Sequence, residues 1–294
     1  MRDLPEVTPP GQEEGDSELQ TLLQGIQLPE ALGDDMVIWR YMDLPKFVAM
    51  LAAGGLWFAK ASKLGDDPYE GFCEASHREF PRDEYGPSPV TGQGTVQISL
   101  QRFDAEMRYN AAEVCRNARE HLYVNSWCLA SESMAMWQIY GSLGNGLAIR
   151  STVGQYEKAA SFGIPNSLTR FGRVEYLDDF ISCEAVRRDF SDGAIPIGSG
   201  LIETVLTLAF NKRRCYAYEN EWRAAIYQDP EPEKEGDYVE FDLNHLINGV
   251  YVAPKAPAFF LDAVQAIMGK FSLAKPLKRS SLLAPPPTKQ NTFG

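Results

Sequence analysis

The sequence lacks the arrangements of cysteine and histidine that mark disulfide scaffolds and zinc sites. It has 294 residues with five cysteines and three histidines, and the cysteines are widely spaced without a Cys-x-x-Cys pair. An odd number of scattered cysteines favours reduced thiols that fill the core as small apolar side chains. The sequence therefore predicts no structural zinc and no disulfide framework, and we expect a protein of a reducing compartment.

Long apolar runs and glycine-rich phosphate loops are also missing. No apolar run reaches the ~18 residues that a membrane-spanning helix requires, and the start of the chain has no basic-then-apolar signal segment. The nearest thing to a phosphate loop is "GSLGNG", which lacks the preceding strand and following helix, and no G-x-S-x-G motif occurs. We therefore expect a cytoplasmic protein that contacts no membrane and is neither a P-loop nucleotidase nor a serine hydrolase.

The chain carries an excess of acidic charge. It has 40 acidic and 28 basic residues, a formal net charge of -12, and nine of the acidic residues lie within the first 35 positions. Tight non-specific DNA binding depends on neutralising phosphates, so an acidic body argues against it. Apolar residues make up 44% of the chain, which is enough for a large core.

Composition divides the chain into three parts. Residues 1–33 are rich in Pro, Gly and Glu and are predicted to form a flexible acidic leader, residues 34–276 a single domain, and residues 277–294 a flexible tail. The predicted strands are 36–42, 56–60, 122–130, 145–151, 171–179 and three late ones from 221 on. They alternate irregularly with predicted helices at 44–53, 102–121, 131–141, 200–213 and 256–271. The absence of a regular βαβ order predicts an α+β fold with a mixed, mainly antiparallel sheet and flanking helices.

Two acidic segments are candidates for a functional site. In "YENEWR", strand alternation places Glu219, Glu221 and Arg223 on one face, with Tyr218 and Trp222 on the core face. That face is either a solvated strand surface on which Arg223 screens the two acids, or a pair of carboxylates aimed into a cleft, where they suit a cationic transition state.

The second acidic segment is "LGDDPYEG" (64–71). It is interpreted as a turn fixed by Pro68, as a loop that contacts a ligand, or as a metal site formed by Asp66, Asp67 and Glu70. The segment "NSWCLASESMAMWQIYG" adds Asn125 and Ser126, polar side chains on a buried strand that need a partner, which a ligand can provide.

Several segments, taken in order, resemble the bacterial domain-of-unknown-function 2971 family. They are "WRYM", "GGLWFAKASKLGDDPYEG", "SWCLASESMAMWQIYGSLGNGLAIR", "VEYLDD" and "NKRRCYAYENEWRAAI", and together they span most of residues 36–255. The chain departs from that family at Asp66, where Asn is usual, and at Gln138-Ile139, where Ser-His is frequent. The family name itself implies no activity.

The order of residue types also resembles that of ADP-ribosyltransferases, which carry an Arg on the first strand, a Ser on a middle strand and a late Glu-x-Glu. Here Arg40, Ser126 (or Ser131) and Glu219-Asn220-Glu221 follow that order, although no Ser-Thr-Ser stands on the middle strand. The resemblance implies an ADP-ribosyltransferase-like fold that uses NAD as substrate.

The same resemblance implies roles for individual residues. Arg40 grips the pyrophosphate, Ser126 supports the nicotinamide pocket, Glu221 stabilises the oxocarbenium-like transition state and Glu219 orients the acceptor. Further residues are candidates for contacts with the nucleotide, either through aromatic stacking or as charged groups: Trp39, Tyr41, Trp57, Asp67, Tyr69 and Arg223.

The sequence thus favours an NAD-using ADP-ribosyl transferase or NAD hydrolase, with a setting in bacterial defence or toxin action implied by the resemblance alone. Two alternatives remain open. One is a non-catalytic module that binds a nucleotide or a protein. The other is a nuclease that uses Asp66, Asp67, Glu70 and Glu221 to hold Mg²⁺. The macromolecular acceptor is not indicated by the sequence.

Overall fold

A computed structural model of the chain describes residues 32–64, 67, 70, 117–141, 144–160, 168–177, 199–229, 231 and 233–285. Nearly all of the predicted acidic leader, most of the predicted helix at 102–121, and the candidate residues Asp66 and Tyr69 lie outside these ranges. No helix within the described ranges is long and apolar enough to cross a membrane.

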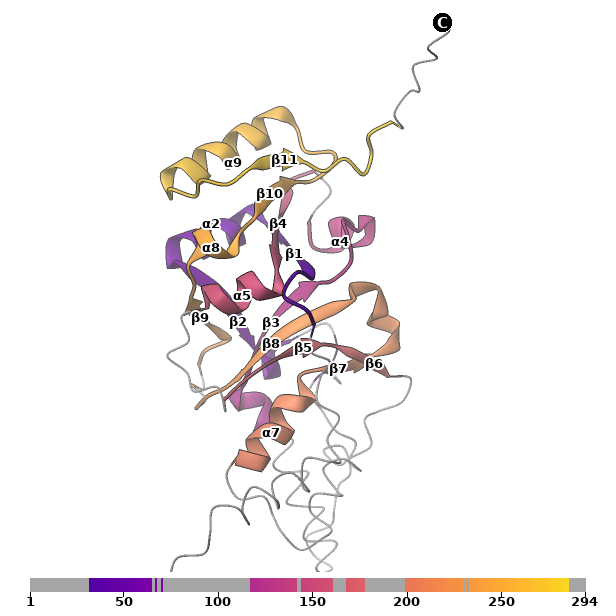
Figure 1. Ribbon diagram of the computed structural model, residues 1–294, viewed down its shortest axis with the longest axis vertical. Helices are drawn as coiled ribbons and strands as arrows, with labels where there is room; N and C mark the ends of the chain where they lie inside the picture. Colours follow the sequence, from indigo (N-terminus) through magenta and orange to yellow (C-terminus); the bar gives the residue numbers. More distant parts are fainter. Residues whose placement is uncertain are drawn as a thin grey trace, which may run out of the picture.

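The described residues form a nine-stranded sheet flanked by helices (Figure 1). The sheet runs β11-β10-β4-β1-β3-β2-β9, and β8 and β5 continue it from the free edge of β3. Every pairing within it is antiparallel except that of β10 with β11, so the predicted α+β fold with a mainly antiparallel sheet is confirmed. The strands are β1 Val37–Asp43, β2 Gly55–Lys60, β3 Leu122–Cys128, β4 Gly146–Thr152, β5 Thr169–Arg173, β8 Glu221–Tyr227, β9 Gly236–Glu240, β10 Gly249–Val252 and β11 Leu277–Arg279.

Strands β6 (Glu175–Leu177) and β7 (Asn211–Arg213) form a separate parallel pair. The prediction of a helix through 200–213 is therefore too long, because α7 ends at Leu208 and β7 follows. The sheet also extends past the predicted domain boundary at residue 276, since β11 pairs with β10. The helical elements are α2 Leu44–Ala53, η1 Ala61–Lys63, α4 Met134–Ile139, α5 Val153–Ala159, α7 Ser199–Leu208, η5 Arg214–Glu219, α8 Leu243–Leu246 and α9 Ala258–Lys270.

Local sequence explains where helices α2 and α4 begin and end. The side chain of Asp43 accepts a hydrogen bond from the Lys46 amide and caps α2. Helix α2 ends at Gly54, whose φ of +65° is the left-handed conformation that glycine adopts without strain. Ser133 caps α4, because its hydroxyl accepts a hydrogen bond from the Met136 amide at 3.4 Å.

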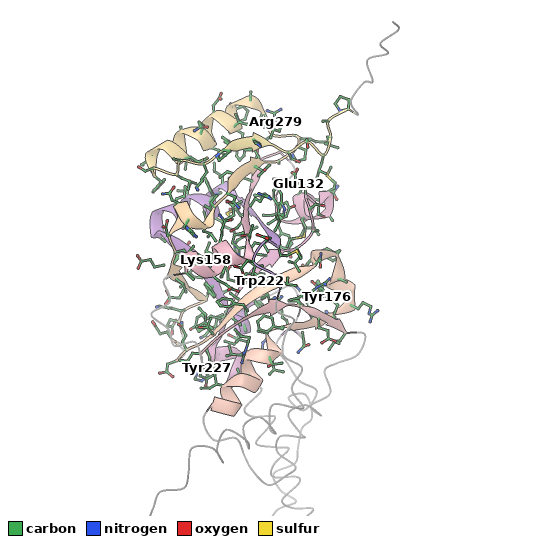
Figure 2. The ribbon with its side chains drawn as sticks, in the orientation of Figure 1. Glu132, Lys158, Tyr176, Trp222, Tyr227 and Arg279 are labelled. Carbon is green, nitrogen blue, oxygen red and sulfur yellow. The ribbon has the colours of Figure 1, made fainter. Side chains whose placement is uncertain are left out.

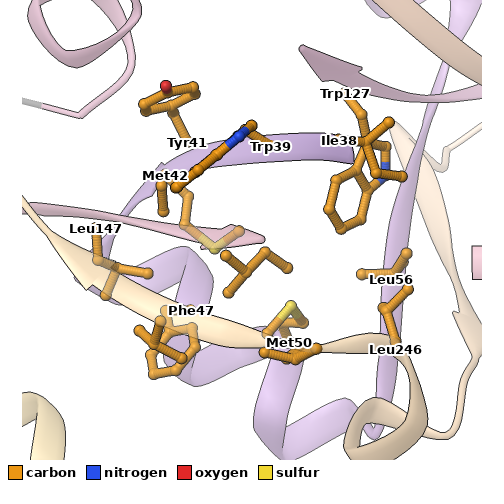
Figure 3. Close-up of a cluster of buried hydrophobic side chains, with 14 of the residues drawn as sticks. Ile38, Trp39, Tyr41, Met42, Phe47, Met50, Leu56, Trp127, Leu147 and Leu246 are labelled. Atoms are coloured by element: carbon orange, nitrogen blue, oxygen red, sulfur yellow. The ribbon is translucent and has the colours of Figure 1, made fainter. Parts of the chain in front are cut away.

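The main core fills the space between the sheet and helices α2, α5, α8 and α9. Strand β1 and helix α2 contribute Ile38, Met42, Phe47 and Met50 to it (Figure 3). A second, smaller apolar cluster joins α7 and the residues after it to the other face of β3 and β8, and its members include Val124, Ala225, Leu206 and Phe210. Helices α9 and α7 lie at opposite ends of the part of the chain that the structure describes (Figure 1).

The sheet forks along β3. One edge of β3 pairs with β8 over its full length, from Leu122–Tyr227 to Cys128–Glu221. The other edge is shared by two strands, with β1 paired at Cys128 and β2 paired at Tyr123 and Val124. Since β1 and β2 meet the same edge at different ends, they diverge beside the middle of β3. That opening positions the candidate site.

Candidate functional site

A cleft of about 720 Å³ lies at the fork in the sheet. Its walls come from β1, α2, β2, β3, β7 and β8, together with Met136, Tyr140, Glu70 and Tyr238. A volume of several hundred Å³ is typical of a site for a small molecule of cofactor size. The lining combines an apolar side, formed largely by α2 and β2, with a cluster of charged side chains at the end of β8.

The cleft brings together most of the residues that the sequence singled out. The predicted site residues that line it are Trp39, Arg40, Tyr41, Trp57, Ser126, Glu219, Glu221 and Arg223. Asp67 does not line it, because the side chain is buried and accepts from Arg213 Nε at 2.9 Å. The predicted contact of Asp67 with a ligand is therefore wrong for this cleft. Tyr69 lies outside the described residues.

Arg40 fills the fork between β1 and β2. Its Nη1 donates to the Ser126 carbonyl oxygen at 2.9 Å, and its Nη2 reaches the Trp57 carbonyl at 3.5 Å. The amide of the neighbouring Asn125 also donates to the Trp57 carbonyl, at 2.8 Å. These side chains satisfy carbonyl groups near the point where the ladder is interrupted. Burial lowers the pKa of Arg40, but a guanidinium stays charged at any physiological pH.

The two polar residues of β3, Asn125 and Ser126, differ in whether the protein itself satisfies them. Asn125 is fully buried and satisfied from within the protein, because its Oδ1 accepts from Trp127 Nε1 at 2.7 Å and from the Tyr156 hydroxyl at 3.2 Å. The partners that Asn125 was expected to need are therefore supplied by the protein, and no ligand is required to satisfy this side chain. Ser126 is different, since its main chain anchors Arg40 and the residue itself lines the cleft.

The two glutamates reach the cleft through a turn that alternation did not predict. Glu219 is the last residue of η5 and Glu221 is the first of β8. Between them, Asn220 adopts a left-handed conformation with φ +42°, which Asn tolerates better than most residues. Its carbonyl accepts from the Leu129 amide at 2.8 Å, and its side chain accepts from Arg173. Both carboxylates thereby turn toward the same cation.

That cation is Lys212 on β7, which no sequence pattern marks as a site residue. Its ammonium donates to Glu219 Oε2 and, at 2.8 Å, to Glu221 Oε1. The Tyr216 ring covers a further side, with its centroid 4.8 Å from Nζ. A lysine seven and nine residues before two acids gives no local signal, because the contact depends on η5 and the turn at Asn220.

Arg223 completes the charged cluster. Its Nε donates to Glu221 Oε2, its Nη2 pairs with Glu70, and its Nη1 donates to the Ala209 carbonyl at 2.7 Å. Glu219, Glu221 and Arg223 are 1%, 5% and 2% exposed. The interpretation of this strand face as a solvated surface is therefore wrong. So is the placement of Tyr218 in the core, since that side chain is exposed.

The surroundings give the two carboxyl groups opposite properties. Burial and the neighbouring Glu221 raise the pKa of Glu219 to about 7. Burial also acts to raise the pKa of Glu221, but Arg223 and Lys212 outweigh it and hold that pKa well below its ordinary value. At neutral pH the cleft therefore contains one fixed carboxylate and one carboxyl group that exchanges a proton.

The acidic residues are paired with cations in a way that disfavours metal binding. Among the described residues, no group of three or more His, Cys, Asp or Glu side chains could hold a metal ion. Glu70 and Glu221 both pair with Arg223, and Asp67 pairs with Arg213. The nuclease hypothesis required Asp67, Glu70 and Glu221 to share a Mg²⁺ ion, so the observed pairing does not support it. Asp66 lies outside the described residues.

No family model matches the chain, and no curated protein matches it significantly, so the predicted resemblance to the domain-of-unknown-function 2971 family stays a prediction. Among solved structures, the chain is similar to DarT from Thermus sp. 2.9 in complex with NAD⁺, with 11% identity, a TM-score of 0.35, and coverage of 85% of this chain and 98% of that chain. The complex with carba-NAD⁺ gives 10% identity, a TM-score of 0.34, and coverage of 84% and 96%. The complex with ADP-ribosylated ssDNA gives 11% identity, a TM-score of 0.33, and coverage of 86% and 96%. TM-scores of this size carry no argument about chemistry, so the function is inferred from the residues of the cleft.

Proposed function

We propose that the protein is an NAD-using enzyme that transfers ADP-ribose to an acceptor or hydrolyses NAD. The observation that carries the proposal is that one cleft is lined by Arg40 from β1, Ser126 from β3 and Glu221 from β8. These residues lie 86 and 95 positions apart along the chain, and the geometry joins them at the fork in the sheet. An Arg, Ser and Glu series in this order is what the resemblance to ADP-ribosyltransferases implies.

The chemistry of the cleft suits loss of nicotinamide from NAD. As the bond between the ribose and nicotinamide breaks, the leaving group takes the electron pair and the ribose becomes an oxocarbenium-like cation. Glu221 remains ionised beside Arg223 and Lys212, so its carboxylate stabilises that cation without having to lose a proton first. Trp57, Tyr41 and Tyr238 offer aromatic surfaces for the flat rings of the dinucleotide.

Glu219 supplies the second part of the reaction. Water, or a nucleophilic group of the acceptor, attacks the ribose carbon, and the proton that it releases passes to the Glu219 carboxylate. A pKa of about 7 lets this carboxyl group accept a proton and return it to solvent near neutral pH. With water as the acceptor the balance is NAD⁺ and water to ADP-ribose, nicotinamide and a proton.

The test is nicotinamide release from NAD by the purified protein, followed by mass spectrometry. Wild type should release nicotinamide, and Glu221→Gln should lower the rate at least 100-fold, because loss of one charge-stabilising group costs 10²–10³ in kcat. Glu240→Gln serves as the matched control, since Glu240 is an exposed glutamate on β9. Circular dichroism and urea unfolding of each variant verify the fold. Equal behaviour of wild type and Glu221→Gln with NAD contradicts the proposal.

One observation favours a second candidate function, a cleft that binds a nucleotide without turning it over. Both oxygens of Glu221 already accept hydrogen bonds from Lys212 and Arg223, so the carboxylate is closely engaged within the protein. A binding module predicts that NAD or ADP-ribose raises the melting temperature while no nicotinamide is released. The same samples therefore distinguish the two candidates.

A further inference from the structure

The two carboxyl groups at the end of the cleft share one ammonium but differ in their second partner. Lys212 Nζ donates to one oxygen of each. The other oxygen of Glu221 accepts from the cationic Arg223, whereas the other oxygen of Glu219 accepts from the neutral Tyr140 hydroxyl at 2.6 Å. Among the described residues, Glu221 therefore has two cationic partners, Lys212 and Arg223, whereas Glu219 has only Lys212, which it shares with Glu221.

Burial and strand pairing fix the position of the Lys212 side chain. The residue is 7% exposed, β7 fixes its backbone through parallel pairing with β6, and the Tyr216 ring covers the ammonium. Burial acts to lower the pKa of Lys212, but Glu221, Glu70 and Glu219 outweigh it and raise that pKa above its ordinary value. The ammonium is therefore a permanent charge at a fixed place.

The other described titratable groups around Glu219 and Glu221 do not give Glu219 a second cationic partner. From β3, Cys128 lines the same cleft, and burial together with both glutamates raises the pKa of its thiol, so it stays neutral. From β6, the Tyr176 hydroxyl accepts a hydrogen bond from the Glu221 amide, and its pKa is also raised by burial. The third carboxylate, Glu70, pairs with Arg223. Lys212 is thus the cation that donates directly to Glu219.

We propose that Lys212 is a positioning residue that sets the protonation of Glu219, because its ammonium donates directly to that carboxyl group, whereas Glu221 also pairs with Arg223. The proposal deepens the function proposed above, because it assigns how one site holds a fixed carboxylate beside a proton acceptor. Without Lys212, Glu219 loses its cation while Glu221 keeps Arg223. An ionised Glu219 would then lie beside the charged Glu221 without the shared ammonium, so Glu219 holds its proton to a higher pH.

The first readout is a titration that needs no catalysis. Protein labelled with ¹³C at the glutamate side-chain carboxyl is titrated by NMR, and the Glu219 resonance is assigned by its absence from Glu219→Gln. In Lys212→Met the midpoint of Glu219 should move up by about 1 pH unit or more, the size of shift that one close opposite charge produces. Lys255→Met, at an exposed lysine, should leave the midpoint unchanged.

Rescue and kinetics separate positioning from a purely structural role. Lys212→Arg keeps the charge and should return the midpoint most of the way toward that of wild type. If the protein turns over NAD, the acidic limb of its pH–rate profile should move up in Lys212→Met by the same amount as the NMR midpoint. A role in packing alone would lower the rate equally at all pH values.

An unchanged Glu219 midpoint in folded Lys212→Met overturns the proposal. Should that variant fail to fold, Lys212→Gln keeps a hydrogen-bond donor without the charge, and the same criterion applies to it. Failure of the proposed function gives a different result, namely no nicotinamide release by wild type whatever the titration shows. The two failures are therefore distinguishable.

Discussion

The two faces of strand β8 are both buried, but for opposite physical reasons. On one face Trp222 stacks on Phe171 with ring centroids 6.0 Å apart and meets the edge of Tyr156 at 4.8 Å. On the other face Glu221 and Arg223 meet an ion-pair network at the end of the cleft. Trp222 lies in the middle of the molecule (Figure 2). Removal of apolar area from water stabilises the first face, whereas burial of charge on the second costs free energy that the partners must offset.

The difference teaches that burial alone does not reveal what a strand face does. The apolar face depends on shape and area, so its contribution to stability should change little with pH. The charged face depends on protonation, and its partners come from the distant segments that contain Glu70, Lys212 and Ala209. Four experiments test this contrast, in order of decreasing expected effect.

The largest effect is expected on the apolar face. Trp222→Ala should lower the free energy of unfolding by about 4–5 kcal/mol, because it removes a fully buried aromatic ring and leaves a cavity. Urea unfolding at pH 5 and pH 8 should give nearly the same loss. A loss that differs strongly between the two pH values would contradict the assignment of this face to packing.

On the charged face, Arg223→Met should lower the free energy of unfolding by about 3 kcal/mol at pH 8, since it leaves Glu221 and Glu70 buried without their cation. The pKa of Glu221 is held low in the folded protein, so its contribution is present above the ordinary value of 4.5 and is lost as the pH falls. The variant should therefore be less destabilised at pH 4 than at pH 8. An equal loss at both pH values would show that Arg223 acts mainly through packing.

Glu219 gives the opposite dependence on pH. Its folded pKa is raised from 4.5 to about 7, so its protonated form adds stability that is fully present below pH 4.5 and is lost as the pH rises through 7. Glu219→Gln mimics the protonated group. Below pH 4.5 the variant and wild type should unfold alike, and at pH 8 the variant should be more stable by on the order of 1 kcal/mol after allowance for screening. Urea midpoints across this range decide the sign, and a variant that is less stable at pH 8 would be inconsistent with it.

The smallest effect concerns the turn that separates the two glutamates. Asn220→Ala should cost about 1 kcal/mol, because an alanine at φ +42° meets the steric penalty of the left-handed region. Asn220→Gly is the matched control and should cost less, since glycine adopts this conformation freely. If both substitutions cost the same, the loss comes from the side-chain hydrogen bond with Arg173 and the backbone conformation is not the cause.

Much of the fold could be predicted from the sequence because its signals are local. The cap at Asp43, the stop at Gly54 and the alternation of Trp222, Ala224 and Ile226 lie within short windows, and the structure agrees with each. The fork beside β3 could not be predicted, since it depends on which ends of β1 and β2 pair with the same edge. The hydrogen bonds of Arg40 to the carbonyl groups at that fork could not be predicted for the same reason.

The candidate site was predicted in part. Arg40, Ser126 and Glu221 were singled out from their order along the chain, and the cleft brings them together. Lys212, Tyr140 and Cys128 gave no signal, because each acts through a contact with a distant or irregular segment. Asp67 was misjudged because a turn-like acidic segment does not reveal that one of its members will pair with Arg213.

The sequence by itself determined that Glu221 and Arg223 share one face of a strand and that Trp222 lies on the other, because side chains alternate in any extended chain. Only the tertiary structure decided that the charged face is buried. That outcome depends on α7, β7 and Glu70 closing over β8, and on a left-handed Asn220 that brings Glu219 to the same ammonium. Alternation is a property of the local backbone, whereas burial and charge pairing depend on which distant segments pack together.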